Sequence, residues 1–288
     1  MRGETTYLKK ENIERALAVS CAAYNVTKDN YTQKDVIASE LLQRVRTVNA
    51  NLQTSFTEPL LFTTNVTDMQ CFVVADHFSK TLFVSFRGSE SLSDWYHDLL
   101  FRKRALFHPT TPDLEGLKVH RGIFRQLLTG SSYTDLKTCI DTFVRTHAYT
   151  VCVTGHSLGG GLATLFSYLL ALRKPDLNVT CITFASPRIG NKEFKKHYQN
   201  TFNLFHLRCT CTNDLVSLLP VWNYHHTGEH LDFQADGTYR FIPLQDDKTS
   251  GYLSLLRAVS LEAHKVASFV AHVKQLPRTF KVKYLSVS

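Results

Sequence analysis

Residues 149–165 read Tyr-Thr-Val-Cys-Val-Thr-Gly-His-Ser-Leu-Gly-Gly-Gly-Leu-Ala-Thr-Leu and combine three local signals. The apolar, β-branched run that ends at Thr154 predicts a short buried strand. Gly155 and Gly159 frame a sharp turn, because a side chain at either position would crowd it. The apolar run from Leu162 onward predicts a helix. A strand, a tight turn and a helix therefore follow one another, with Ser157 in the turn.

Ser157 is a candidate nucleophile in this setting. A Gly-x-Ser-x-Gly turn between a strand and a helix lifts the serine hydroxyl above the sheet edge. The free N–H groups at the helix N-terminus then point at any negative charge that forms beside it. The pentapeptide alone occurs by chance in many loops, so the prediction rests on the flanking strand and helix. The alternative is a glycine-rich turn without chemistry.

Composition limits the class of protein. A chain of 288 residues, 43% hydrophobic and 20% charged, suits a single α/β domain spanning 1–288. The net charge of +8 does not predict nucleic-acid binding, because no aromatic-interleaved basic stripe accompanies it. The cluster Arg102-Lys103-Arg104 fits peripheral contact with an anionic membrane as well as it fits a solvated surface. The sequence leaves the oligomeric state open.

The N-terminal residues and the cysteines predict a cytoplasmic protein. Residues 1–11 lack the apolar core of a signal peptide, and no window has the apolar length of a membrane span. The seven cysteines are odd in number and mostly lie among apolar residues, as reduced core cysteines do. Cys209 and Cys211 have no second ligand pair at a suitable spacing, so no metal or other cofactor is expected.

Strands and helices alternate along the rest of the chain. Helices are predicted over 10–24, 33–49, 131–146 and 162–172, and strands over 70–76, 81–86, 149–154, 179–185, 204–209 and 222–228. The strands 70–76 and 81–86 read as a hairpin. Alternation of this kind predicts an α/β fold with a central, mostly parallel sheet flanked by helices and with its chemistry at the carboxyl ends of the strands.

Ser89 follows one of these strand ends. Gly88 before it lets the backbone approach a neighbouring group closely. Ser89 offers both an N–H and a hydroxyl as donors, and an acyl-transfer site needs donors placed where the oxyanion develops. The alternative is a strand-to-loop turn in which Ser89 only caps a helix.

A serine hydroxyl becomes a good nucleophile when a base takes its proton and an acid orients that base. In hydrolases with such a turn, the acid and then the histidine follow the serine along the chain. Asp214 is the candidate acid, because it follows an apolar strand and precedes an apolar run, where an unpaired carboxylate is costly. Pattern alone leaves the base open among five histidines: His225, His226, His230, His264 and His272.

Together these motifs resemble the class 3 lipase family, the fungal triacylglycerol lipase-like branch of the α/β-hydrolases. The resemblance extends from about Ile13 to Leu276. Its carriers are Val84-Ser85-Phe86-Arg87-Gly88-Ser89 with Asp94-Trp95, then Val119-His120-Arg121-Gly122-Ile123-Phe124, Gly155-His156-Ser157-Leu158-Gly159, Ala185-Ser186-Pro187-Arg188-Ile189-Gly190-Asn191 and Asn213-Asp214-Leu215-Val216.

The resemblance implies roles for five residues. Ser157 is the implied nucleophile, Asp214 the acid and His264 the base of a catalytic triad. Ser89 and the N–H of Leu158 are the implied oxyanion donors. The aspartate common just before the family's catalytic histidine is absent here.

The resemblance also implies an α/β-hydrolase fold with a short helical lid over the site. The segment 90–101, with Leu92, Trp95 and Tyr96, matches that lid. The implied protein is a serine carboxylic-ester hydrolase that acts on lipid esters at an interface, most simply a triacylglycerol or acylglycerol lipase with an acyl-enzyme intermediate. A phospholipase A1 or a soluble esterase on the same triad is the alternative enzyme. A catalytically inactive lipid-binding relative is the alternative outside enzymes.

Overall fold

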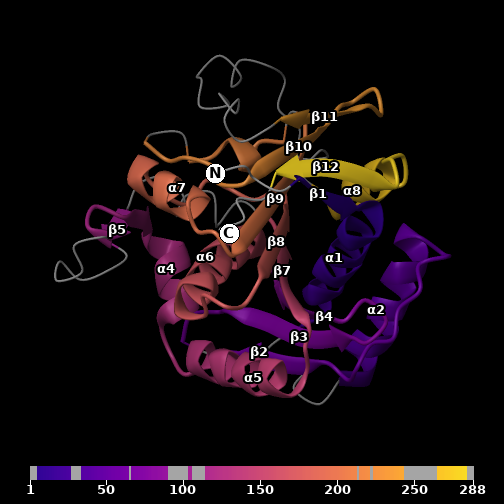
Figure 1. The fold of residues 1–288 in the computed structure, drawn as a ribbon, viewed down its shortest axis with the longest axis horizontal. Helices are drawn as coiled ribbons and strands as arrows, with labels where there is room; N and C mark the ends of the chain where they lie inside the picture. The colour runs from indigo at the N-terminus through magenta and orange to yellow at the C-terminus, as the bar shows by residue number, and fades with distance from the viewer. Residues whose placement is uncertain are drawn as a thin grey trace.

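The computed structural model describes residues 5–26, 34–64, 66–89, 103–105, 114–212, 214–220, 223–242 and 265–283 (Figure 1). Within these ranges the chain forms an eight-stranded sheet in the order β11-β10-β9-β8-β7-β4-β3-β2. Its strands are β2 (Leu60–Thr63), β3 (Gln70–Asp76), β4 (Thr81–Phe86), β7 (Thr150–His156), β8 (Val179–Phe184), β9 (Leu204–Cys211), β10 (Glu229–Phe233) and β11 (Tyr239–Ile242). The five strands from β10 to β4 are parallel, and the outer pairs are antiparallel.

Helices cover both faces of this sheet (Figure 1). One face carries α1 (Lys10–Ala22), α2 (Lys34–Val48) and α8 (Val266–Val273), and the other carries α4 (Arg121–Leu128), α5 (Ser132–Thr146), α6 (Leu158–Arg173) and α7 (Lys192–Gln199). Two small ribbons pair β1 (Thr5–Lys9) with β12 (Thr279–Lys283) and β5 (Lys103–Ala105) with β6 (Lys118–His120). The predicted mostly parallel sheet between helices is confirmed.

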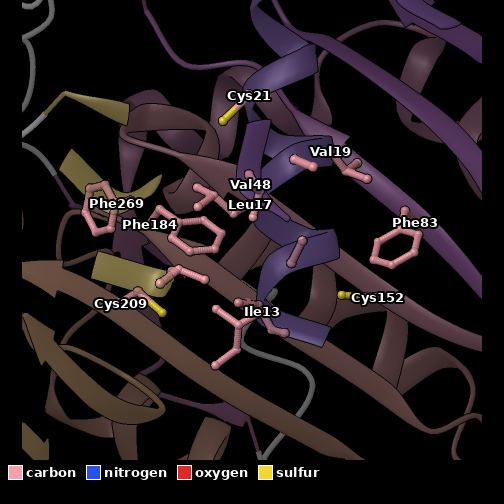
Figure 2. Packing of buried hydrophobic residues seen from close by; sticks show 14 of the residues in the cluster. Ile13, Leu17, Val19, Cys21, Val48, Phe83, Cys152, Phe184, Cys209 and Phe269 are labelled. Atoms are coloured by element: carbon pink, nitrogen blue, oxygen red, sulfur yellow. The ribbon is translucent and has the colours of Figure 1, made fainter. Parts of the chain in front are cut away.

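The central strands are apolar on both faces because both faces are covered. On β7, Val151 and Val153 pack toward α6, while Cys152 packs toward α1. Figure 2 shows the core on the α1 side, where Leu17 and Phe184 lie among other buried side chains. No helix in the described part of the chain is both long enough and apolar enough to cross a membrane.

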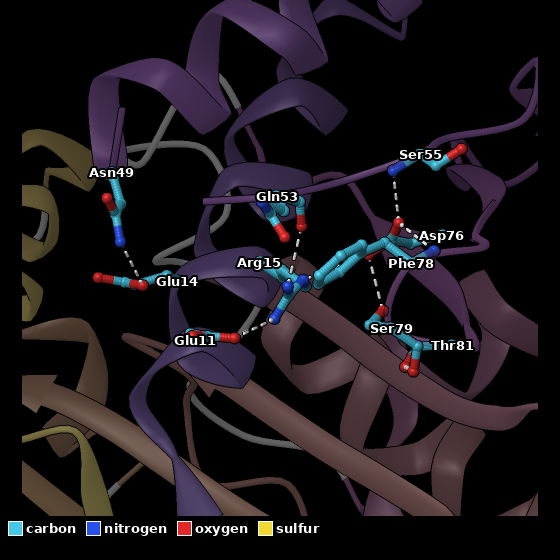
Figure 3. A network of polar contacts seen from close by, with 10 residues as sticks. All are labelled: Glu11, Glu14, Arg15, Asn49, Gln53, Ser55, Asp76, Phe78, Ser79 and Thr81. Atoms are coloured by element: carbon cyan, nitrogen blue, oxygen red, sulfur yellow. Dashed lines mark hydrogen bonds and ion pairs between the residues drawn. The ribbon is translucent and has the colours of Figure 1, made fainter. Parts of the chain in front are cut away.

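A polar network joins α1 to the amino edge of the sheet, opposite the edge that carries Ser157 (Figure 3). Arg15 Nε lies 3.2 Å from Asp76 Oδ2, and both side chains are buried. Asp76 also accepts hydrogen bonds from Ser55 N at 2.7 Å and Ser79 Oγ at 2.7 Å. The buried carboxylate is thus both charge-paired and hydrogen-bonded, as burial of a charge requires.

The predicted strand over 222–228 is wrong for its described part. Residues 223–228 form only an isolated bridge between Gly190 and His225, and the strand begins at Glu229. Gly228 has φ +78°, which ends any extended run before β10. His226 and Thr227 are both buried, so the alternation of inward and outward side chains that defines a half-buried strand is lost.

Candidate active site

Ser157 stands on the turn between β7 and α6. Its backbone has φ 58° and ψ −129°, a conformation that non-glycine residues rarely adopt and that costs on the order of 1–3 kcal/mol. Two backbone hydrogen bonds stabilise it, from Ser157 N to Phe184 O at 2.9 Å and from Gly160 N to Ser157 O at 2.9 Å. The side chain is fully buried, and its Oγ has no hydrogen-bond partner among the described residues. The sequence-predicted strand, turn and helix are all present around it.

Close backbone approaches require the two framing glycines. A Cβ on Gly155 would lie 2.9 Å from Gly160 N, and a Cβ on Gly159 would lie 2.9 Å from the carbonyl carbon of Arg87. Both distances are too short for a side-chain carbon, so the predicted crowding is present. The second contact also shows that the start of α6 packs against the end of β4. The serine turn and the segment before Ser89 are therefore in contact.

The two predicted oxyanion donors lie on these contacting segments. Phe86 pairs with Gly155, so β4 and β7 end side by side, and Ser89 follows β4 with part of its surface exposed. Leu158 is the first residue of α6, where backbone N–H groups have no acceptor within the helix. The arrangement can place two N–H donors and the positive end of a helix dipole beside charge that develops next to Ser157.

Asp214 lies at the same edge of the sheet, after β9, which is separated from β7 by β8 alone. Its carboxylate is buried, and its Oδ1 accepts a hydrogen bond from Val216 N at 3.0 Å. Its own N–H donates to Cys211 O at 3.1 Å. Burial raises the pKa of the Cys211 thiol, and the negative charge of Asp214 raises that pKa further. The structure thus brings the predicted acid and the predicted nucleophile to one edge.

Three of the alternative histidines bond to other groups. His226 Nε2 lies 2.7 Å from Ser217 O, and His230 Nε2 lies 2.7 Å from Thr210 Oγ1. His272 lies between two carbonyl oxygens, those of Ser268 at 2.6 Å and Gln234 at 3.0 Å. No described histidine, His225 included, donates to or accepts from Ser157 Oγ.

The structure does not describe the residues predicted as the base and the lid. His264 lies outside the described residues, directly before Lys265, at which the structure resumes ahead of α8. The predicted lid residues Leu92, Trp95 and Tyr96 also lie outside them. These assignments stay predictions. Among the described residues, no group of His, Cys, Asp and Glu could hold a metal ion.

Tyr24 and His156 are site neighbours that sequence reasoning missed. Tyr24 OH lies 2.7 Å from His156 Nδ1, and a Cβ on Gly88 would lie 3.2 Å from Tyr24 Cζ. The His156 ring also makes an edge contact with Phe269 of α8, with 6.0 Å between ring centroids. Tyr24 therefore contacts both His156, directly before Ser157, and Gly88, directly before Ser89. In the sequence it reads only as part of the apolar face of a helix, which carries no signal for this role.

A buried polar cluster lies behind the site, between β9 and the loops that follow β8 and β9. Burial, with a smaller contribution from the Arg208 charge, lowers the pKa of His206 to about 3. Burial also lowers the pKa of His226 well below its usual value, and Arg208 and Arg188 add to that effect. Both imidazoles are therefore neutral at pH 7.

Comparisons with known proteins identify relatives of this chain. Residues 83–224 match the family model of lipase (class 3). The lipase of Rhizomucor miehei is 31% identical over 178 residues, which cover 58% of this chain and 46% of that protein. This chain belongs to the class 3 lipase family. A second relative is the chloroplastic phospholipase A1-Ialpha2 of Arabidopsis thaliana. It is 32% identical over 162 residues, which cover 49% of this chain and 33% of that protein.

The solved structures share the fold of this class 3 lipase chain. Lipase II from Rhizopus niveus superposes with a TM-score of 0.72 over 91% of this chain and 96% of that chain, at 20% sequence identity. This chain spans about half the length of the Rhizomucor miehei lipase and about a third of that of the Arabidopsis thaliana phospholipase. At this identity the superposition establishes the α/β-hydrolase architecture.

Proposed function

We propose that this class 3 lipase chain is a serine carboxylic-ester hydrolase that acts on acylglycerols. The observation that carries the proposal is the conformation of Ser157, a non-glycine residue at φ 58° between a parallel strand and a helix N-terminus. A backbone conformation of this cost persists when the surrounding structure over-determines it, and such positions cluster at functional sites. A glycine-rich turn without chemistry would not need a serine there.

In the proposed reaction, Ser157 Oγ attacks the ester carbonyl carbon, and His264 takes the hydroxyl proton as general base. Asp214 orients His264 and stabilises its imidazolium form. The tetrahedral oxyanion accepts hydrogen bonds from Ser89 and from Leu158 N–H. The imidazolium then protonates the departing alcohol, which leaves an acyl-Ser157. Water, activated by the same histidine, releases the fatty acid.

Burial of Ser157 supports the interfacial part of the proposal. With no exposed side-chain surface, the nucleophile can meet an ester only after the residues that cover it move. We propose that the segment 90–101, with Leu92, Trp95 and Tyr96, is a lid that moves when it meets a lipid surface. Its apolar side chains suit such a surface.

The test is hydrolysis of a chain-length series of acylglycerols, above and below micelle formation. The wild type and Ser157→Ala are compared, with Ser132→Ala as a matched control, because Ser132 is a buried serine on α5. We expect wild type and Ser132→Ala to be active and to speed up on aggregated substrate, and Ser157→Ala to lose roughly 10⁴-fold or more. Equal, uncatalysed rates for all three proteins would overturn the proposal. An inert wild type that still binds lipid would favour a non-enzymatic role.

A phospholipase A1 is the second candidate, because the Arabidopsis relative that matches 49% of this chain is named one. The two candidates share the triad and differ in the head group of the substrate. Side-by-side rates on trioleoylglycerol emulsions and dioleoylphosphatidylcholine vesicles separate them. A higher rate on the phospholipid, with the acid released from the sn-1 position, would replace the first candidate by the second.

Cytoplasmic residence is a further part of the proposal. All seven cysteines are free thiols, and all except Cys139 are buried, as suits a reducing compartment. Peripheral contact with anionic lipid through the basic residues around Lys103 is proposed with it. Cell fractionation, together with binding to vesicles that contain phosphatidylserine, tests both parts.

A further inference from the structure

The turn that carries Asp214 is stabilised by a hydroxyl on its own chain. Ser217, in the short 3-10 helix Val216–Leu218, donates from Oγ to Asp214 O at 2.8 Å. Val216 N donates to the carboxylate of the same residue at 3.0 Å. The Ser217 side chain thus holds the main chain of Asp214, and the Val216 main chain holds its carboxylate. Both bonds are buried, where exchange with water is excluded and bond geometry is well fixed.

His226 holds this turn from the other side. Its Nε2 lies 2.7 Å from Ser217 O, and both residues are buried. A carbonyl oxygen only accepts, so Nε2 must carry a hydrogen and donate it. Because burial and the charges of Arg208 and Arg188 lower the pKa of His226, the ring is neutral and that hydrogen is its only one. The contact therefore fixes the tautomer of His226 as well as the position of Ser217.

Charged and titratable side chains surround the His226 ring. Among the described residues, the charges of Arg208, Arg188 and His230 act on its ring, and all three side chains are themselves buried. Arg188 also supports the same turn, since its N–H donates to Leu219 O at 2.7 Å. The ring thus stands against a turn that is fixed at its other end by the loop after β8.

The geometry points to His226 and Ser217 as positioning residues for Asp214: the imidazole fixes the Ser217 main chain, and the Ser217 hydroxyl fixes the Asp214 main chain. This inference rests on the proposed function, because it assigns the pair to the support of the triad acid. The expected consequence of loosening the turn is a carboxylate displaced from the base, and misplacement of about 1 Å in an active site lowers the rate about a hundredfold.

Ser217→Ala tests the inference against a matched control. Ser132 Oγ also donates to a main-chain carbonyl, Thr63 O, at 2.8 Å from a buried position, so Ser132→Ala removes the same kind of bond far from Asp214. We expect Ser217→Ala to lower kcat about tenfold to a hundredfold at unchanged KM, and Ser217→Thr to restore it. The acid limb of the kcat/KM profile should shift to lower pH, because the imidazolium of the base loses the support of a fixed carboxylate. Ser132→Ala should change neither quantity.

His226→Phe gives a second, independent perturbation of the same turn. It removes the donor to Ser217 O, and we expect the same fall in kcat and the same shift of the pH profile. If the wild type is active and Ser157→Ala is inert, but Ser217→Ala and His226→Phe both keep wild-type kcat and pH profile in their folded fraction, the pair is merely structural and the inference is overturned. If the wild type itself is inert, the proposed function fails, and this inference falls with it.

Discussion

Phe269 offers a test of how α8 contributes to the site. It is fully buried and lies close to Phe184 (Figure 2), which it meets edge-on at 5.6 Å between ring centroids. It also meets Phe233 edge-on, at 6.1 Å between ring centroids. Each such aromatic pair contributes about 0.5–1.5 kcal/mol beyond its buried area, so Phe269→Leu should lower the free energy of unfolding by about 1–3 kcal/mol. The same ring touches His156, next to Ser157.

Phe194 is the matched control on the other face of the sheet. It is equally buried and has two aromatic partners, Tyr168 at 5.0 Å and Tyr198 at 5.7 Å, so Phe194→Leu should cost a similar free energy. Of these two phenylalanines, Phe269 is the one that lies on α8, the helix that follows His264. We therefore expect Phe269→Leu to lower kcat about tenfold or more at a temperature where both variants are folded, while Phe194→Leu keeps wild-type kcat.

Urea unfolding and initial rates on an emulsified acylglycerol measure the two effects separately. Equal kcat for the two variants, at equal loss of stability, would refute the reasoning. It would mean that the packing of α8 against His156 does not position the proposed base.

Three further outcomes follow from buried polar groups. His206 and His226 are neutral in the folded protein but titrate near 6.5 when unfolded, so the unfolded state binds more protons and stability falls as the pH falls below about 6.5. For His206 the loss is about 2 kcal/mol at pH 5, and His226 acts in the same direction; urea midpoints at pH 7 and 5 measure the change, which His206→Gln should reduce. Asp76→Asn leaves the buried Arg15 with only the largely exposed carboxylate of Glu11 and should cost about 3 kcal/mol of stability with kcat unchanged, because the pair lies at the opposite sheet edge; a matching loss of kcat would contradict this placement. Tyr24→Phe should lower kcat while costing only about 1–2 kcal/mol, and unchanged kcat would remove it from the site.

The sequence predicted the elements that local chemistry determines. The Gly-x-Ser-x-Gly turn has the expected strand before it and the expected helix after it, because crowding at Gly155 and Gly159 is a short-range effect. The mostly parallel sheet was predicted from the alternation of strands and helices.

Burial of polar side chains by other segments of the chain could not be predicted from the sequence. On β9, His206 and Arg208 alternate with apolar residues, which is typical of a strand with one solvated face. Both are buried beside the loops that follow β8 and β9, whose residues Ser186, His226 and Thr227 line one pocket with them. The predicted strand before β10 failed for the same reason, since His226 and Thr227 turn inward to partners on other segments. The residue pattern left the general base open among five histidines, and its assignment to His264 rests on the resemblance to the class 3 lipase family.

Labelling with a long-chain 4-nitrophenyl alkylphosphonate tests the central claim most directly. Attack by a serine Oγ on phosphorus forms a new O–P bond and expels 4-nitrophenolate, so one adduct per chain can be counted by intact-protein mass spectrometry. The account predicts one adduct on the wild type, mapped by peptide sequencing to Ser157, and none on Ser157→Ala. An adduct on another residue, or equal labelling of Ser157→Ala, would contradict the assignment of Ser157 as the nucleophile.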